Sequence, residues 1–267
     1  MDKGKVFRTL HEGPDLFVVP NPWDPGTARL LESMGFKALA TTSAGFAFSR
    51  ALPDGAVGFE AMIAHCREIV AATDLPVSAD LEKGKGDSPD SAAQTIFAAD
   101  AAGLAGCSIE DHTGDTAKPI YDFNHAVERI AAAAEAARAL KHDFVFTARA
   151  ENFLWDRPDL DDTILRLQAF AKAGADVLYA PGLADIATIR AICAAVDRPV
   201  NVLAVSRLTV ADLAEAGVKR VTLGSKLTTA AFGAVRNAAR EILDAGTFTF
   251  ADEAIPFGTL QALYASR

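Results

Sequence analysis

Short apolar runs alternate with amphipathic, helix-forming segments along most of the chain. Alternating strand and helix signals favour βαβ units and a parallel sheet. Runs that are apolar on both faces fit strands whose two sides are covered. The pattern therefore predicts an α/β fold, a single (β/α)8 TIM barrel. Its eight strands are centred near Phe17, Leu39, Val77, Ser108, Phe146, Leu178, Val202 and Thr222.

The predicted helices carry recognisable end signals. Gly103, Gly174 and Gly217 each follow an Ala at the end of a helical pattern and precede an apolar run. Glycine adopts the left-handed conformation that commonly ends a helix. Asp24 and Thr209 are capping residues at helix starts. These signals predict helices between successive strands.

No Pro/Ser-rich or charge-block linker interrupts this alternation. We therefore expect residues 1–267 to form a single barrel domain. Residues 226–267 follow the eighth strand as a C-terminal helical extension with an apolar ending, which a barrel does not need. An apolar extension could cover the bottom of the barrel or pack on a neighbour, and we expect a homo-oligomer, either a dimer or a tetramer.

Charge and cysteine content narrow the function classes. The formal net charge of −9 disfavours binding to nucleic acid or to an anionic membrane, which needs clustered Lys and Arg. No apolar run approaches the roughly 20 residues of a membrane span, and the N-terminus lacks the apolar core of a signal peptide. Cys66, Cys107 and Cys193 lack the spacing of a disulfide framework or a zinc site. We expect a cytoplasmic protein.

Carboxylates gather where the third and fourth predicted strands end. Asp80 ends one strand and Glu82 follows it, and Glu110 ends the next. Ligands bind at the carboxyl ends of parallel strands, so Asp80 and Glu82 would point into one pocket if the backbone stays extended. One direct carboxylate and two acting through water suit Mg²⁺. The pattern predicts a Mg²⁺ site, with Mn²⁺ as the alternative cation; otherwise these carboxylates cap helices or stay solvated.

Polar residues also end the next three strands. Arg149 ends the fifth, and its planar fork suits the carboxylate or phosphate of a ligand. The alternative partner for its charge is Glu151 or Glu110. Tyr179 and Asn201 end the sixth and seventh strands. We expect both to contact the substrate.

Three loops supply further candidates. The run Thr42-Ser43-Ala44-Gly45 follows the second strand, and its small residues suit backbone N–H contacts to a ligand carboxylate. Asp54 is first a turn residue and second an outer acid of the metal site. After the fourth strand, His112 and Lys118 are the candidates for proton transfer, because His titrates near neutral pH and a loop can close over a ligand. The other interpretation of His112 is a structural hydrogen bond.

At these positions the sequence resembles the isocitrate lyase and phosphoenolpyruvate mutase superfamily. The likeness rests on four motifs whose order and spacing cover most of the barrel: Thr42-Ser43-Ala44-Gly45, Asp80-Leu81-Glu82-Lys83-Gly84-Lys85-Gly86, Ile109-Glu110-Asp111 and Ala148-Arg149-Ala150-Glu151. The resemblance implies Mg²⁺ near Asp80, with Glu82 and Glu110 in its shell and Asp54 further out. It also implies that the backbone at Ser43 and Ala44, together with Arg149, binds the substrate carboxylate.

The resemblance further implies a lyase or decarboxylase that cleaves a C–C bond of a small 2-oxo or 2-hydroxy carboxylate through a metal-stabilised enolate. Lyase members of the family carry a Lys-(Lys/Arg)-Cys-Gly-His motif after the fourth strand, whereas residues 111–122 of this chain contain no Cys. Two alternatives stay open: P–C bond chemistry on a phosphonate, as a mutase or a phosphonopyruvate hydrolase, and a barrel that binds a 2-oxo acid without turnover. Family members often exchange a helix after strand eight between subunits, which would explain the extension.

Overall fold

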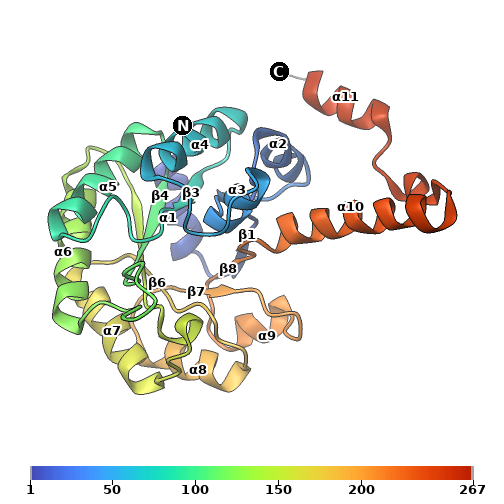
Figure 1. Ribbon diagram of the computed structural model, residues 1–267. Helices are drawn as coiled ribbons and strands as arrows, with labels where there is room; N and C mark the ends of the chain where they lie inside the picture. The colour runs from blue at the N-terminus through green and yellow to red at the C-terminus, as the bar shows by residue number, and fades with distance from the viewer. Residues whose placement is uncertain (1, 266–267) are drawn as a thin grey trace.

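Eight parallel strands form one sheet that curves into a barrel in the computed structural model, which describes residues 2–265 (Figure 1). The strands follow the order β1-β8-β7-β6-β5-β4-β3-β2. The two ends of this order meet where the Ala40 amide donates to the carbonyl of Pro20, with an N···O distance of 3.0 Å. The predicted (β/α)8 barrel is therefore confirmed. The strands are β1 (Phe17–Val19), β2 (Leu39–Ala40), β3 (Val77–Asp80), β4 (Gly106–Glu110), β5 (Val145–Arg149), β6 (Val177–Tyr179), β7 (Val200–Leu203) and β8 (Arg220–Thr222).

Helices surround the strands, as Figure 1 shows. Each predicted strand position falls within a strand or next to its end, so the alternation of patterns located the elements correctly. The helices are α1 (Lys3–Glu12), α2 (Pro25–Ser33), α3 (Ser43–Ser49), α4 (Phe59–Ala72), α5 (Pro89–Ala101), α6 (Phe123–Ala139), α7 (Leu160–Ala173), α8 (Ile186–Ala195), α9 (Val210–Glu215), α10 (Lys226–Ala245) and α11 (Phe257–Ala265), with 3-10 turns at Asn152–Trp155 and Thr249–Glu253.

The helix ends follow the local sequence. Gly174 ends α7 in the left-handed region with φ 110°, and the glycines after α5 and α9 also have positive φ. A residue with a Cβ is strained in this conformation. At the other end, the Asp24 side chain accepts a hydrogen bond from the Thr27 amide at 2.7 Å, and Thr209 and Asp212 form a capping box at α9. The predicted caps are confirmed.

The two faces of the strands differ in polarity. Residues such as Ile109, Phe146 and Leu178 belong to the main apolar core, which lies between the sheet and the helices. The inner face carries buried polar side chains instead, among them Ser78, Ser108, Thr147, Asn201 and Thr222. The prediction that the strands are apolar on both faces was therefore wrong for the inner face. A polar cavity, rather than layers of aliphatic side chains, occupies part of the barrel interior.

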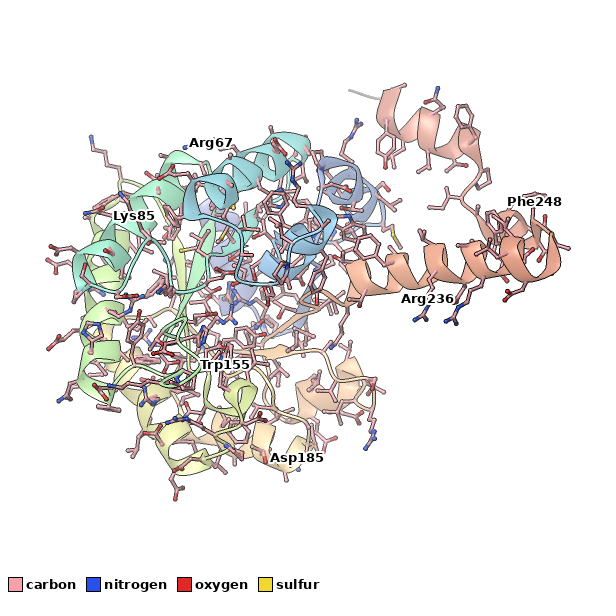
Figure 2. All side chains as sticks on the ribbon, in the orientation of Figure 1. Arg67, Lys85, Trp155, Asp185, Arg236 and Phe248 are labelled. Carbon is pink, nitrogen blue, oxygen red and sulfur yellow. The ribbon has the colours of Figure 1, made fainter. Side chains whose placement is uncertain are left out.

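The C-terminal helices form an arm beside the barrel. Helix α10 projects away from the strands, and Phe248 lies near its far end (Figures 1 and 2). Helix α11 returns to α2, where Arg29 donates to the carbonyls of Leu263 and Tyr264 at 2.7 and 3.1 Å. Most side chains of this arm are exposed, including large apolar ones such as Leu243 and Phe257. Within residues 2–265 no helix combines the length and the hydrophobicity needed to cross a membrane.

Candidate active site

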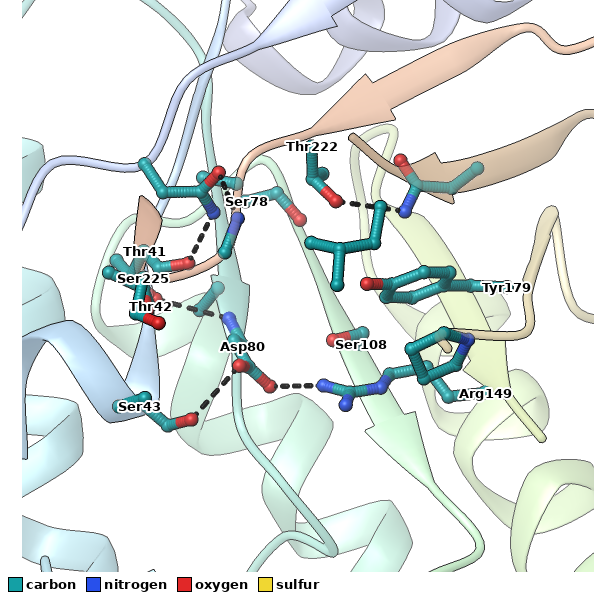
Figure 3. A pocket seen from close by; sticks show the side chains of 18 of the residues that line it. Thr41, Thr42, Ser43, Ser78, Asp80, Ser108, Arg149, Tyr179, Thr222 and Ser225 are labelled. Atoms are coloured by element: carbon teal, nitrogen blue, oxygen red, sulfur yellow. Dashed lines mark hydrogen bonds and ion pairs between the residues drawn. The ribbon is translucent and has the colours of Figure 1, made fainter. Parts of the chain in front are cut away.

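A cavity of about 230 Å³ opens at the carboxyl ends of the strands and reaches into the barrel (Figure 3). Side chains from six separate segments that were predicted to form the site line this cavity, including Asp54. The predicted substrate-binding residues Thr42, Ser43, Ala44, Asp80, Arg149, Tyr179 and Asn201 all line it. The cavity has the place expected for the active site of a parallel α/β barrel.

Arg149 forms the centre of a charge cluster. Its guanidinium contacts Asp80 through Nη1 at 2.6 Å and Glu110 through Nη2 at 2.9 Å. Its Nε donates to Glu151 at 2.8 Å. Burial alone would lower the pKa of Arg149, but these three carboxylates raise it well above its usual value. The ion pairs that were the alternative to ligand binding are therefore present in this structure, and binding of a ligand by Arg149 stays a prediction.

A second cavity, of about 390 Å³, adjoins the first and shares Ser43, Asp54 and Arg149 with it. Glu82 and Glu110 line this second cavity. The backbone does not stay extended at Glu82, whose φ of 49° is left-handed, so the simple alternation expected between Asp80 and Glu82 is wrong. The turn nevertheless leaves Glu82 within reach of the other carboxylates.

The carboxylates carry more negative charge than Arg149 can balance. Burial, followed by the charges of Asp80 and Glu110, raises the pKa of Glu82 to about 8. Burial and the same two neighbours also raise the pKa of Asp54, to which Ser43 donates a hydrogen bond at 3.4 Å. Carboxylates that repel one another in this way favour a bound cation. The donor set therefore fits a hard, oxygen-preferring metal ion.

The arrangement is not a closed metal cage. Across residues 2–265, no group of three or more His, Cys, Asp and Glu side chains is placed to hold an ion directly. Zinc sites normally provide such a cage, whereas Mg²⁺ is commonly bound by one or two carboxylates and several waters. The predicted metal site, with Asp80 as the direct ligand and Glu82 and Glu110 acting through water, stays a prediction.

Two aromatic rings close the second cavity. His112 stacks on Trp155 with ring centroids 3.9 Å apart and planes at 9°. The buried Nε2 of His112 and Nε1 of Trp155 have no hydrogen-bond partner among the residues that the structure describes. On its other side, His112 Nδ1 lies 3.6 Å from Glu110 Oε1. Two buried ring nitrogens therefore have hydrogen-bonding capacity that the described residues do not use.

Lys118 is not brought to these cavities. Its ammonium group is 2.9 Å from the carboxylate of Asp122, and both side chains are largely exposed. It lines neither cavity. The i,i+4 pair with Asp122 accounts for its position, so this structure does not support a role for Lys118 in proton transfer.

Asp111 and Arg166 hold the loops that carry the site. Asp111 Oδ1 accepts from the Glu151 amide at 2.9 Å, and its Oδ2 pairs with Arg166 Nη1 at 3.0 Å. Arg166 also donates to the Tyr121 carbonyl at 3.0 Å. Burial raises the pKa of Asp111 to about 6, although Arg166 opposes the shift. The network joins the loops after β4 and β5 to each other and to α7.

Small residues form the opposite wall. Thr42 caps α3, and its Oγ1 accepts from the Gly45 amide at 3.1 Å. Ser43 and Ala44 therefore lie in the first turn of the helix, where backbone N–H groups lack helical partners. Ser43 also donates to Asp80 at 3.0 Å, a contact visible in Figure 3.

Sequence reasoning missed several polar residues of the first cavity. Asn21 accepts from the Leu223 and Gly224 amides at 2.8 and 3.1 Å, which fixes the loop after β8. The others are inner-face residues: Ser78, Ser108, Arg220 and Thr222. A signal was present, because Ser78 and Ser108 stand two positions before strand-end acids and therefore share their face.

Comparison with known proteins places the chain in a family. The family model for phosphoenolpyruvate phosphomutase matches residues 7–243. The chain belongs to the isocitrate lyase/phosphoenolpyruvate mutase superfamily. The superfamily identified from the four motifs is thus confirmed.

Relatives within this superfamily have different names. A probable 2-methylisocitrate lyase of Corynebacterium glutamicum is 33% identical over 74% of this chain and 65% of its own. A putative lyase/mutase of Burkholderia cenocepacia is 52% identical, with a TM-score of 0.97 over 99% of this chain and 96% of its own. A phosphonopyruvate hydrolase crystallised with oxalate and Mg²⁺ is 26% identical, with a TM-score of 0.88 over 99% and 95% of the chains. The fold is shared across members of the superfamily with different reactions.

Proposed function

We propose that this chain is a Mg²⁺-dependent enzyme that cleaves a carbon–carbon bond in a small 2-oxo or 2-hydroxy carboxylate, as a lyase or decarboxylase. The observation that carries this proposal is the contact of Arg149 with Asp80 and Glu110 at a cavity with surplus carboxylates. Membership of the superfamily and the lyase name of the Corynebacterium relative support it.

The metal-binding residues in this proposal are Asp80 as the direct ligand and Glu82 and Glu110 through water, with Asp54 further out. Their mutual repulsion supports the assignment, since burial and like charges raise the pKa of Glu82 to about 8. When bound, Mg²⁺ or Mn²⁺ would polarise the oxygens of the substrate and stabilise negative charge on them. The cation would also relieve the repulsion among the carboxylates.

The substrate carboxylate would bind at the first turn of α3, through the backbone N–H groups of Ser43 and Ala44. Arg149 faces this turn across the cavity, with Asp80 between them (Figure 3). Its guanidinium would stabilise the oxyanion that develops as the bond breaks. Tyr179 would shape the wall beside it, since the Arg149 guanidinium lies 5.2 Å from the centre of the Tyr179 ring.

Proton transfer is assigned to His112. Its Nδ1 lies 3.6 Å from Glu110 Oε1, its Nε2 is buried without a hydrogen-bond partner among the described residues, and the stack on Trp155 limits rotation of the ring. His112 would transfer a proton to the fragment that leaves when the bond breaks, and the Nε1–H group of Trp155 would donate a hydrogen bond to the same fragment. This pair would replace the Cys-containing motif of the lyase members, because the loop has no Cys.

Phosphorus–carbon bond chemistry is the second candidate. The similarity to a phosphonopyruvate hydrolase with oxalate and Mg²⁺ favours it, as does the family model for a phosphomutase. Both reactions use a small 2-oxo acid and one cation site, so the residues above keep their roles. The two candidates differ in the group that leaves the carbon.

The test is thermal denaturation with oxalate, with and without Mg²⁺, on the wild type and on Asp80→Asn. A ligand that binds the folded state raises the melting temperature by mass action. We expect a Mg²⁺-dependent shift in the wild type and none in Asp80→Asn. Asp244→Asn, an exposed position on α10, is the matched control and keeps the shift. No shift in the wild type would contradict the proposal.

Turnover then separates the candidates. Release of pyruvate from oxaloacetate, at a rate above that of the metal alone, would support C–C cleavage. Release of phosphate from phosphonopyruvate would support P–C chemistry. Metal-dependent binding of both with no product from either would leave a binding barrel without turnover. We also predict that the protein is a homo-oligomer and that it is located in the cytoplasm.

A further inference from the structure

Arg220 is a buried cation without an acidic partner. It is the first residue of β8, and only 4% of its surface is exposed. Its Nε donates to Asn201 Oδ1 at 2.8 Å, and its Nη2 donates to Thr147 Oγ1 at 3.1 Å. Its Nη1 lies 3.2 Å from His11 Nε2. No carboxylate in residues 2–265 forms an ion pair with it.

The third contact is neutral as well. His11 Nδ1 lies 2.8 Å from the Phe7 carbonyl, which only accepts, so the ring proton is on Nδ1. His11 Nε2 must then accept from Arg220. Burial, followed by the charge of Arg220, lowers the pKa of His11 to about 3, which keeps the ring neutral. Burial also lowers the pKa of Arg220 to about 10, opposed only by Tyr179.

Other buried arginines of the chain are compensated. Arg149 contacts three carboxylates, and Arg166 pairs with Asp111 and Asp162. Arg129 donates to two backbone carbonyls, and Tyr121 and nearby acids oppose the effect of burial on its pKa. Among these four, Arg220 alone contacts neither a carboxylate nor a backbone carbonyl in the structure described, and its acceptors are an amide oxygen, a hydroxyl and a neutral imidazole. The positive charge of Arg220 is therefore not compensated by any carboxylate of the described residues, and an anionic ligand could compensate it.

Arg220 lines the same cavity as Asp80 and Arg149. Pairing between neighbouring strands aligns Arg149 with Tyr179, Tyr179 with Asn201, and Asn201 with Arg220. The Arg220 guanidinium then reaches Thr147, two residues before Arg149 on β5. Two residues of a strand span roughly 7 Å, so this end of Arg220 lies about one layer below Arg149. Barrel interiors usually place branched aliphatic side chains in such layers.

The guanidinium has donors to spare. It carries five N–H groups and uses three of them in the contacts above, which leaves two. Hydroxyl groups of Ser78, Ser108 and Thr222 line the same cavity. A planar fork with spare donors beside hydroxyl groups suits a carboxylate. The cavity thus offers cationic groups at two depths.

We propose that Arg220 is the core of a lower subsite that binds a second carboxylate of the substrate and so selects dicarboxylic over monocarboxylic acids. Asn201 and Thr147 position the guanidinium, and the neutral His11 holds it from below. This inference rests on the proposed function, because it assumes that the first carboxylate binds at Ser43, Ala44 and Arg149. It adds a specificity residue that none of the four motifs contains.

The test compares two stable 2-hydroxy acids that differ in one terminal carboxylate, malate and lactate. Their affinities are measured by calorimetry with Mg²⁺ on the wild type, Arg220→Gln and Arg220→Lys, with oxalate as the probe of the upper subsite. We expect the wild type to prefer malate by about tenfold or more, as a charged hydrogen bond predicts. Arg220→Gln should lose the preference, and Arg220→Lys should retain part of it. Oxalate should bind all three proteins equally.

Each other result is decisive. Equal malate and lactate affinities in the wild type, with oxalate bound, would overturn the lower subsite and leave the proposed function intact. Failure of the wild type to bind oxalate as well would overturn the proposed function itself. An unchanged malate preference in Arg220→Gln would show that Arg220 is structural. Circular dichroism checks whether Arg220→Gln folds. If it does not, the test uses the ratio of malate to lactate affinity in the wild type and in Arg220→Lys. A ratio that is the same in both proteins would contradict selection by the guanidinium fork.

Discussion

Arg149 Nη1 lies 2.6 Å from Asp80 Oδ1, so the guanidinium occupies one side of the carboxylate that we assign to the metal. In the metal-free protein Arg149 is the cation that keeps Asp80, Glu110 and Glu151 close together. A bound divalent cation would share this task. If the proposed metal site is correct, the contact would therefore link the stability of the fold to occupancy of that site.

Replacing Arg149 with Met should expose this link. Removing one partner of a buried ion pair costs about 3–5 kcal/mol, because the remaining charges stay buried without compensation. We expect Arg149→Met to lower the melting temperature of the metal-free protein, and Mg²⁺ to restore more stability to this variant than it adds to the wild type. Calorimetry at matched Mg²⁺ concentrations checks this. Arg236→Met, on the exposed face of α10, is the control. If Mg²⁺ raised the melting temperature of Arg149→Met and of Arg236→Met by the same amount, the link would be refuted.

The aromatic pair predicts a graded loss of rate. Trp155→Phe keeps the stack on His112 and removes only the unpartnered Nε1–H group. We expect kcat to fall by about tenfold, since a hydrogen bond to a charged group contributes about 1.5–3 kcal/mol. His112→Asn should reduce kcat by about 10²-fold or more, as loss of a general acid does. Steady-state kinetics on the accepted substrate measures both.

Lys118→Ala provides the contrast within the same loop. The lysine pairs with Asp122 at the surface and lines neither cavity. We expect its removal to leave kcat and KM within about twofold of the wild type, because Lys118 lines neither cavity. Stability should also change little, since exposed ion pairs contribute about 0–1 kcal/mol. A large loss in Lys118→Ala, with little in His112→Asn, would reverse the assignment and show that the loop moves during catalysis.

The sequence predicted the barrel correctly and selected residues that line the cavity at the carboxyl ends of the strands, for a local reason. Strand periodicity, glycines after helices and capping residues act over a few positions, and the barrel follows from their alternation. Asp80, Glu110 and Arg149 were found because each ends a strand, where the fold puts ligands. Such features need no knowledge of distant contacts.

The lower half of the cavity depends on contacts that the local pattern does not contain. Arg220 looks like a residue at the edge of a short apolar run, yet it meets His11 across 209 positions and Thr147 across 73. Glu82 takes a left-handed conformation that favours glycine, so simple alternation gave the wrong backbone there. Lys118 was selected for its residue type, and its pairing with Asp122 became visible only in the fold.

The buried His11 predicts a pH dependence of stability. Its pKa in the folded protein is lowered to about 3, below the ordinary value of about 6.5 in the unfolded chain. Between these two pKa values the unfolded state binds more protons than the folded state. The contribution of His11 to the free energy of unfolding is therefore fully present above pH ~6.5 and is lost progressively as the pH is lowered. His11→Gln keeps an acceptor for Arg220 and does not titrate. We expect the variant to lose less stability than the wild type between pH ~7 and ~5, in urea denaturation. Parallel curves would contradict a buried, neutral His11.

The exposed arm predicts self-association. Leu243 on α10 is 84% exposed and Phe257 on α11 is 80% exposed, although both are large and apolar. A face of this kind normally packs on another surface, and a second copy is the occupant that the resemblance to the superfamily implies. We expect sedimentation analysis to give a dimer or tetramer for the wild type.

Charging this face should separate the subunits. The double variant Leu243→Glu, Phe257→Glu would place two carboxylates in a desolvated interface, which is strongly unfavourable without partners. Its mass should fall toward that of a monomer. Leu165→Glu, at an apolar position on α7 that is 57% exposed, adds one carboxylate on the barrel and should leave the mass unchanged. A monomeric wild type, or an oligomer that the double variant does not weaken, would show that the arm has another role.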